Sequence, residues 1–183
     1  MVAEKNEMTV ELKDKEVVMQ RVINAPRELV FDAFTKAEHL TKWFGPHGFE
    51  TTATTDPRQG GAFRIVMHAT DSLPPEFQGD YPMSGIYIEF DRPKKLVYTN
   101  DLSDHSEKWK EELNVKCGTQ SDEALKSLAT ITFEDVGGKT RVTLRSSFAS
   151  NAIRDGYVKQ GMNQGWSETF DRLESFVART DHR

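Results

Sequence analysis

Histidine is the side chain best suited to acid–base chemistry and metal binding near neutral pH. The chain has five: His39, His47, His68, His105 and His182. None forms an i, i+4 pair or a His-x-Glu group, which are the spacings of helical zinc sites and deaminases. The single cysteine, Cys117, cannot add a cluster of thiolates or form an internal disulfide. The sequence therefore predicts no metal site.

Charged side chains close to tyrosines are a second source of chemistry. Arg64 and Glu89 fall on expected strands, and a buried carboxylate beside Tyr87 or Tyr98 would suit a general acid or base. A cross-strand ion pair at the surface explains the same two charges more simply. His47, in a Gly-Pro-His-Gly loop, is a further candidate polar group for a cavity mouth, with a solvated loop histidine as the alternative.

Signatures of known catalytic sites are missing from the sequence. Asp101, Asp104 and His105 are close together but lie in a charged stretch that favours solvated surface. There is no Gly-x-Ser-x-Gly elbow and no Walker loop, and Gly60-Gly61 lacks the strand–turn–helix context of a dinucleotide site. We therefore assign no catalytic residue and no cofactor, and expect a binding protein rather than an enzyme.

Large apolar side chains are the remaining candidates for function. We expect nine of them to contact a ligand: Trp43, Phe44, Phe63, Met67, Tyr87, Trp109, Met162, Trp166 and Phe170. Small-molecule sites are concave and mostly apolar, so these residues would line a cavity if the fold encloses one. Otherwise they form an ordinary hydrophobic core.

The elements that position these residues are readable from the pattern. A strand is expected over 16–23, a helix beginning at Pro26, and a second short helix over 37–44 ended by Gly45-Pro46. Six further strands are expected as an antiparallel meander: 49–55, 62–69, 83–90, 95–99, 129–134 and 140–148. Apolar and polar residues alternate in the last two, which indicates a sheet with one buried face.

A long helix is expected from 151 to about 178. Its apolar residues recur at helical spacing along one stripe: Met162, Trp166, Phe170, Leu173 and Val177. Gly156, Gly161 and Gly165 weaken its first half and indicate close packing or a bend.

Length and composition bound the organisation of the chain. A length of 183 residues predicts one domain, which we place at 15–178 between a flexible segment over 1–14 and a tail over 179–183. The net charge of −5 disfavours a nucleic-acid partner. Because no secretory signal and no long apolar run is visible, we expect a cytoplasmic protein without a membrane span.

Four stretches resemble a known family. They are Asn24-Ala25-Pro26 through Thr35; Leu40-Thr41-Lys42-Trp43-Phe44-Gly45-Pro46; Gly60-Gly61-Ala62-Phe63-Arg64 with Gly85-Ile86-Tyr87-Ile88-Glu89; and Gly161-Met162-Asn163-Gln164-Gly165-Trp166 followed by Arg172-Leu173. In this order the chain resembles the START-like SRPBCC superfamily, in the branch similar to the C-terminal domain of the activator of heat shock protein 90 ATPase.

The resemblance implies an α+β helix-grip fold, in which about six or seven curved antiparallel strands wrap a long C-terminal helix. It implies a cavity between sheet and helix that takes a small apolar or aromatic molecule. Two other functions follow from the same resemblance: a chaperone-associated, stress-related interaction module, and an enzyme similar to polyketide cyclases. In that enzyme Tyr87, His47, Arg64 and Glu89 would be the polar cavity groups.

The stretch over 101–128 is an insertion relative to short members of this branch. Trp109 and Leu113 fit strand alternation as well as one helical turn, so its conformation stays open. Ordering it costs about 1–2 kcal/mol per residue in backbone entropy, so a few apolar contacts must hold it down. We expect it to close one end of the sheet over the cavity entrance, with Trp109 and Leu113 as anchors.

Overall fold

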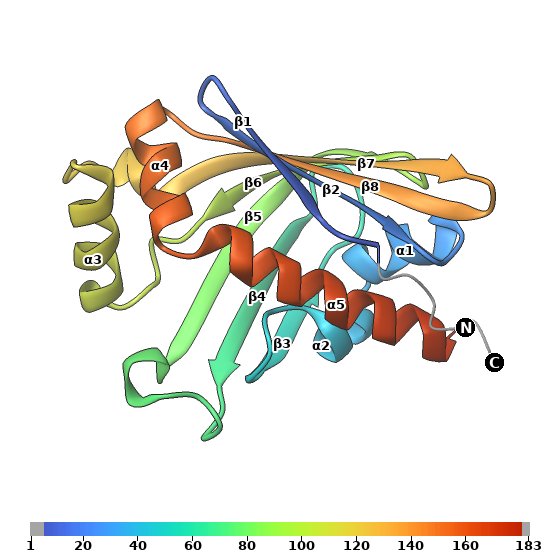
Figure 1. Ribbon diagram of the computed structural model, residues 1–183, viewed down its shortest axis with the longest axis horizontal. Coiled ribbons are helices and arrows are strands. Elements are labelled where there is room, and N and C mark those ends of the chain that lie inside the picture. Colours follow the sequence, from blue (N-terminus) through green and yellow to red (C-terminus); the bar gives the residue numbers. More distant parts are fainter. Residues whose placement is uncertain (1–5, 181–183) are drawn as a thin grey trace.

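A curved antiparallel sheet of eight strands wraps around the C-terminal helix (Figure 1). The computed structural model describes residues 6–180. The strands are β1 (Thr9–Lys13), β2 (Glu16–Ile23), β3 (Phe49–Thr55), β4 (Ala62–Ala69), β5 (Asp80–Asp91), β6 (Lys95–Asp101), β7 (Lys126–Val136) and β8 (Lys139–Ser147), paired in the order β1-β2-β8-β7-β6-β5-β4-β3. The α+β helix-grip prediction is confirmed, with one strand more than expected.

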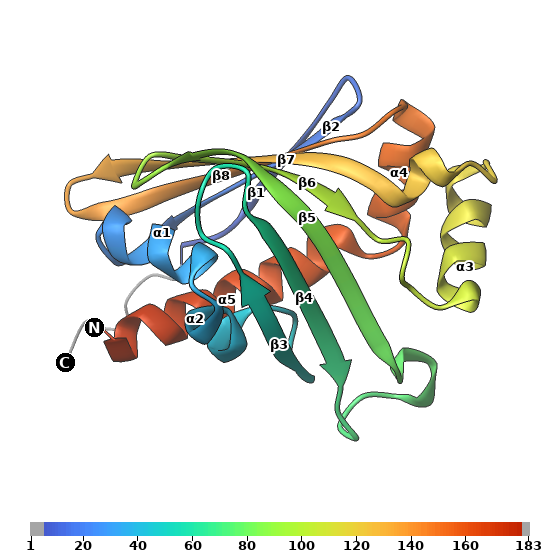
Figure 2. The same ribbon diagram turned by 180° about the vertical axis from the view of Figure 1, so that it is seen from behind.

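The helices gather on the concave face of the sheet and at its two ends. They are α1 (Arg27–Thr35), α2 (Ala37–Trp43), α3 (Glu107–Cys117), α4 (Asn151–Lys159) and α5 (Met162–Thr180), with 3₁₀ turns η1 (Pro75–Phe77) and η2 (Asp122–Leu125). Helix α5 crosses the concave face, α1 and α2 lie at one end, and α3 and α4 lie at the other (Figure 2). The core fills the space between α5 and the sheet.

Alternation along the strands decides which residues face α5. In β8, Val142 and Leu144 are buried while Thr143 and Arg145 lie on the outer face. Because successive side chains in a strand point to opposite faces, a period-two pattern gives one apolar face. This is the pattern that the sequence predicts for the last two strands.

A buried ion cluster holds α5 against β2. Arg21 is on the inner face of β2 with its side chain 1% exposed. Its guanidinium forms an ion pair with Asp171 at 2.8 Å and donates a hydrogen bond to Glu174 at 2.9 Å, both on α5. A buried charge needs such partners, since leaving it unpaired costs several kcal/mol. The cluster therefore orients the helix on the sheet.

The N-terminal segment differs from the expected flexible terminus. Residues 9–13 form β1, which pairs with β2 through a tight turn over 14–15. Lys15 takes the left-handed conformation at φ 57°, without the Gly or Asn that usually indicates such a turn. Residues 1–5 and 181–183 lie outside the described part of the chain, and residues 179–180 belong to α5 and not to a tail.

The expected long C-terminal helix is divided in two. Helix α4 ends at Lys159 and α5 begins at Met162, with Gly161 between them at φ 99°. Only glycine adopts that conformation without strain. Gly156 brings α4 against α3, because an added Cβ would lie 2.3 Å from the Sγ atom of Cys117.

The insertion has structure of its own. The Ser106 side chain accepts a hydrogen bond from the backbone N–H of Trp109 and caps α3, which packs on α4. Leu113 is fully buried, and the half-buried Trp109 ring lies 3.9 Å from the ring of His105. The ambiguous pattern of this stretch therefore folds as a helix. That it closes a cavity entrance stays a prediction.

Candidate functional site

A small cavity lies between the sheet and the short helices. Its volume is about 20 Å³, which is room for a single water molecule. Nine apolar and aromatic residues line it: Phe34, Leu40, Phe44, Phe63, Ile65, Met83, Tyr87, Leu96 and Tyr98. They come from α1, α2 with its following residue, and three neighbouring strands, β4, β5 and β6. The family resemblance implies a ligand-sized cavity between the sheet and the C-terminal helix. This hollow is far smaller, and no residue of α5 belongs to its lining.

Phe63 is central to this lining. Its ring lies 5.2 Å from that of Tyr87 and 5.3 Å from that of Tyr98, on the next two strands. Gly85 makes room for it, because a Cβ there would lie 2.7 Å from the Phe63 ring and 1.8 Å from the carbonyl oxygen of Thr99. The glycine thus lets an aromatic ring lie flat on the strand.

Two tyrosines, Tyr87 and Tyr98, belong to the lining. Within residues 6–180 no protein group hydrogen-bonds either hydroxyl, and neither oxygen is among the fully buried polar atoms that lack a partner. Burial raises the pKa of both phenols well above its ordinary value, so both stay protonated. Buried tyrosine hydroxyls usually find a partner. These two are free to donate to a ligand oxygen.

The roof over the cavity is α2 and the loop that follows it. Trp43 is fully buried and donates its indole N–H to the carbonyl of Ala33 at 3.0 Å. It supports Phe34 and Phe44 from behind, with ring distances of 4.8 and 5.6 Å. Trp43 therefore positions the lining without reaching the cavity.

Arg172 of α5 fixes the loop after α2. Its Nη1 atom donates to the carbonyls of Gly45 at 2.9 Å and Pro46 at 3.0 Å, and lies 3.4 Å from that of Phe44. The hydroxyl of Thr51 donates to the same Phe44 carbonyl at 2.7 Å. Burial lowers the pKa of the guanidinium below its ordinary value. These bonds anchor the roof to the long helix and to β3.

The structure brings together three of the nine predicted ligand residues, Phe44, Phe63 and Tyr87, in the cavity lining. Trp43 and Phe170 are fully buried in the core outside that lining. The other four are half-buried and pack against the core: Met67, Trp109, Met162 and Trp166. Trp166 contacts a lining residue, because its ring lies 5.9 Å from that of Phe44.

The three predicted polar groups lie away from the cavity. His47 is exposed in its loop. Arg64 pairs with Asp104 at 2.7 Å, and Glu89 pairs with Lys95 at 3.1 Å, in both cases at the surface. Both charges therefore form surface ion pairs, but not with each other as the simpler interpretation expected.

Six lining residues were absent from the predicted set: Phe34, Leu40, Ile65, Met83, Leu96 and Tyr98. The signal for three of them was alternation, since Ile65 follows Phe63 by two on β4 and Tyr98 follows Leu96 by two on β6. Which inner-face positions meet α2 depends on the curvature of the sheet, and alternation carries no information about curvature.

A surface groove of about 400 Å³ is the larger hollow. It lies between α2 and the end of α5 and has a mixed, charged lining: Glu38, His39, Lys42, Phe176, Arg179 and Thr180. It shares no residue with the cavity. Its open and charged character suits solvent better than an apolar molecule.

One histidine on the outer face has the partners of a catalytic base. His68 lies 2.9 Å from the hydroxyl of Thr52 and 2.7 Å from a carboxylate oxygen of Asp80. The three are exposed across β3, β4 and β5, and neither hollow includes them. Because neither hollow could hold a substrate beside these three side chains, we interpret their contacts as cross-strand pairs.

Other kinds of site have no support in the described part of the chain. Residues 6–180 contain no group of three or more His, Cys, Asp or Glu side chains placed to hold a metal ion. Within the same range no helix is long and apolar enough to cross a membrane.

Solved structures of bacterial proteins share this fold. A protein from Rhodobacter sphaeroides superimposes with a TM-score of 0.75 at 18% identity, covering 94% of this chain and 99% of that one. One from Staphylococcus epidermidis gives 0.69 at 24% identity, covering 94% and 95%. An AHSA1 protein from Silicibacter pomeroyi gives 0.64 at 18% identity, covering 90% and 99%. At these identities the likeness shows the fold alone.

No curated protein matches the chain. A family model does match, over residues 24–178, and its description is Activator of Hsp90 ATPase homolog 1-like protein. The matched range begins before α1 and ends within α5, so it contains the whole cavity lining and its supports. The chain therefore belongs to the Activator of Hsp90 ATPase homolog 1-like family, and its fold is consistent with the START-like SRPBCC superfamily that the sequence resembles.

Proposed function

We propose that the protein binds a small apolar or aromatic molecule between α2 and the inner face of β4, β5 and β6. The observation that carries this proposal is the cavity itself, lined by nine apolar and aromatic residues, two of which are tyrosines. A tyrosine hydroxyl can donate a hydrogen bond, so a ligand oxygen that reaches Tyr87 or Tyr98 could accept one.

The size of the cavity limits how such a molecule enters. A volume of about 20 Å³ holds one water, whereas a cavity that takes benzene is about 150 Å³. Binding therefore requires side chains to move. The side chains of Leu40 and Phe44 are the candidates, because they come from a seven-residue helix and the residue after it, whereas most of the lining comes from three hydrogen-bonded strands. The ligand replaces their contacts with the strands.

The two hydroxyls narrow the chemistry of the ligand. Both phenols are protonated, so each can donate one hydrogen bond. A flat ring carrying one carbonyl, ether or phenolic oxygen would stack on Phe63 and accept from Tyr87 or Tyr98. An entirely apolar molecule would leave both hydroxyls unpaired and bind more weakly.

The test is a thermal melt with a panel of small aromatics, with and without an oxygen acceptor. A true ligand at a hundredfold excess over Kd stabilises the fold by about 2.7 kcal/mol. Ile65→Phe fills the cavity and should abolish the shift. Ile88→Phe, on the exposed outer face of the neighbouring strand, is the matched control and should keep it. No shift with any compound, or equal shifts in both variants, overturns the proposal.

The family description supports a second proposal, a chaperone-associated interaction module. It predicts binding to Hsp90 through the surface and stimulation of its ATPase, without any need for the cavity. Purified protein that neither binds Hsp90 nor changes its ATPase rate removes this alternative. Ile65→Phe separates the two proposals, because it blocks the cavity and leaves the surface unchanged.

The cyclase-like alternative has less support. His47, Arg64 and Glu89 would be its polar groups, and all three lie outside the cavity lining. The protonated tyrosines can orient a substrate, but neither is poised to accept a proton at neutral pH. We therefore favour binding over catalysis.

A further inference from the structure

Strand β1 is an open edge of the sheet. It pairs with β2 on one side, and within residues 6–180 no strand pairs with its other side. All five of its residues are exposed. An uncovered edge presents free backbone donors and acceptors, which makes it a template for another strand.

The hydrogen bonds of the hairpin show which residues face this edge. The N–H of Phe148 donates to the carbonyl of Lys15 at 2.8 Å, so the backbone groups of Lys15 point toward β8. Backbone groups alternate in direction along an antiparallel strand. The backbone groups of Glu16 therefore point toward β1. Glu16 is paired with Lys13, whose backbone groups point toward β2.

The same alternation directs the backbone groups of two residues of β1 toward the open edge. Val10 and Leu12 lie between the residues that bond to β2, so their N–H and C=O groups face the open edge. Their side chains are 39% and 50% exposed. They lie opposite Met19 and Val17, which are fully buried on the inner face. The apolar inner surface therefore continues onto β1 and ends there uncovered.

We propose that a second copy of this chain covers the edge, with the two β1 strands paired antiparallel about a twofold axis. In such a pair, a residue whose N–H and C=O face the shared edge must lie opposite another residue of the same kind. Placing Val10 opposite Val10 puts Leu12 opposite Met8 on the apolar face. On the outer face it places Lys13 of each copy opposite Glu7 of the other, so two pairs of opposite charge meet. Glu7 lies two residues before β1, and Lys13 also lies 3.8 Å from Glu11 of its own strand.

The neighbouring registers are worse. A shift that places Glu11 opposite Glu11 brings two like charges together at the centre of the pair. A shift that places Leu12 opposite Leu12 requires Asp14 of the turn to pair with Val10. The turn is not free to do so, and the first register remains the best.

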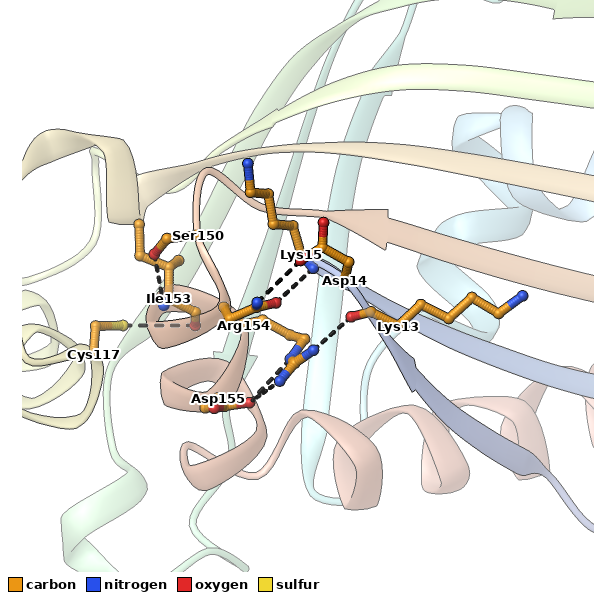
Figure 3. A network of polar contacts seen from close by, with 9 residues as sticks. Lys13, Asp14, Lys15, Cys117, Ser150, Ile153, Arg154 and Asp155 are labelled. Atoms are coloured by element: carbon orange, nitrogen blue, oxygen red, sulfur yellow. Dashed lines mark hydrogen bonds and ion pairs between the residues drawn. The ribbon is translucent and has the colours of Figure 1, made fainter.

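Helix α4 holds the turn of the hairpin in place (Figure 3). The N–H of Lys15 donates to Asn151 at 2.6 Å, and Asn151 donates to the Asp14 carboxylate at 3.0 Å. Arg154 donates to the Lys13 carbonyl and is itself paired with Asp155 at 2.8 Å. The edge strand is therefore held rigid before it meets a partner, which lowers the entropy cost of pairing.

The experiment is sedimentation of the full chain over a wide concentration range, at low ionic strength. We expect a monomer–dimer equilibrium. Lys13→Glu or Glu7→Lys alone replaces two attractive pairs by two repulsive ones and should raise the dimer Kd about tenfold. The double variant Glu7→Lys with Lys13→Glu exchanges the two charges and should restore the original Kd.

A second variant tests the backbone contact. Val10→Pro removes an N–H that faces the open edge and leaves the bonds to β2 intact, so it should abolish the dimer without unfolding the chain. If it does unfold, the charge exchange alone decides. The proposal is overturned if the protein stays monomeric at all concentrations. It is also overturned if the single charge variants leave the dimer Kd unchanged or the double variant does not restore it.

Discussion

The guanidinium of Arg172 on α5 lies 2.9 Å from the carbonyl oxygen of Gly45, in the loop that closes the roof of the cavity. One side chain thus ties the end of a seven-residue helix to the longest helix of the fold. The stability of the roof and the closure of the candidate site depend on the same contact.

Arg172→Leu should therefore loosen the roof. It leaves the carbonyls of the loop after α2 without their donor, and an unsatisfied buried acceptor costs about 1–3 kcal/mol. We expect a lower free energy of unfolding and faster amide exchange over 40–48. Arg141→Leu is the control, since Arg141 makes only a 4.0 Å surface pair with Glu134. Unchanged exchange over 40–48 would contradict the anchoring role.

Arg21→Met tests the buried ion cluster. It removes the buried cation that pairs with Asp171 and Glu174, and breaking a buried ion pair costs about 3–5 kcal/mol. Arg145→Met breaks a partly exposed pair with Glu16 and should cost about 0–1 kcal/mol. Urea denaturation of both variants measures the difference. Equal losses would mean that the Arg21 cluster contributes no more than a surface pair.

Two glycines of the C-terminal region should respond in opposite ways to alanine. Gly156→Ala places a Cβ 2.3 Å from Cys117 Sγ and 2.9 Å from its backbone, so α3 and α4 must separate and the protein loses stability. Gly165→Ala meets only Pro46 at 3.8 Å, and should be neutral or stabilise α5 by up to about 1 kcal/mol. Thermal melts decide; a harmless Gly156→Ala would disprove the tight α3–α4 contact.

His105 makes stability depend on pH. Burial lowers its pKa to about 4, against about 6.5 for a free histidine; a backbone contact with Pro82 and the charge of Asp104 raise the pKa, and the charge of Lys110 lowers it. Between these two values the unfolded chain binds more protons than the folded one, so stability rises with pH from about 4 to about 6.5 and is lost as the pH falls. His105→Phe keeps the stack on Trp109 and should remove this dependence.

The measurement for His105 is the difference in unfolding free energy between wild type and His105→Phe at several pH values. The carboxylates titrate in both proteins and cancel in that difference. A difference that stays constant between pH 4 and 7 would show that the histidine does not titrate in this way.

Sequence patterns predicted the order of the elements well because periodicity and turn residues are local. The strand over 16–23, both short helices and the alternating faces of β7 and β8 follow from them. The sequence did not predict strand β1, because its turn has Lys15 where a glycine is usual and its side chains are exposed on both faces.

The site was predictable in part, for a physical reason. Phe63 and Tyr87 line the small cavity, whereas Trp43 belongs to the support behind it. A buried aromatic residue has the same sequence pattern in either role. The role of Arg172 was not predictable, because its only signal was its position beside Leu173. Its contact with Gly45 joins residues that are far apart in the chain.

The most direct test of the central claim is an NMR titration with a small aromatic carrying one oxygen acceptor. Binding in the cavity predicts saturable amide shifts on α2, β4, β5 and β6, lost in Ile65→Phe and kept in Ile88→Phe. Saturable shifts confined to the groove around Lys42 and Arg179, or no saturable shift with any such compound, would contradict it.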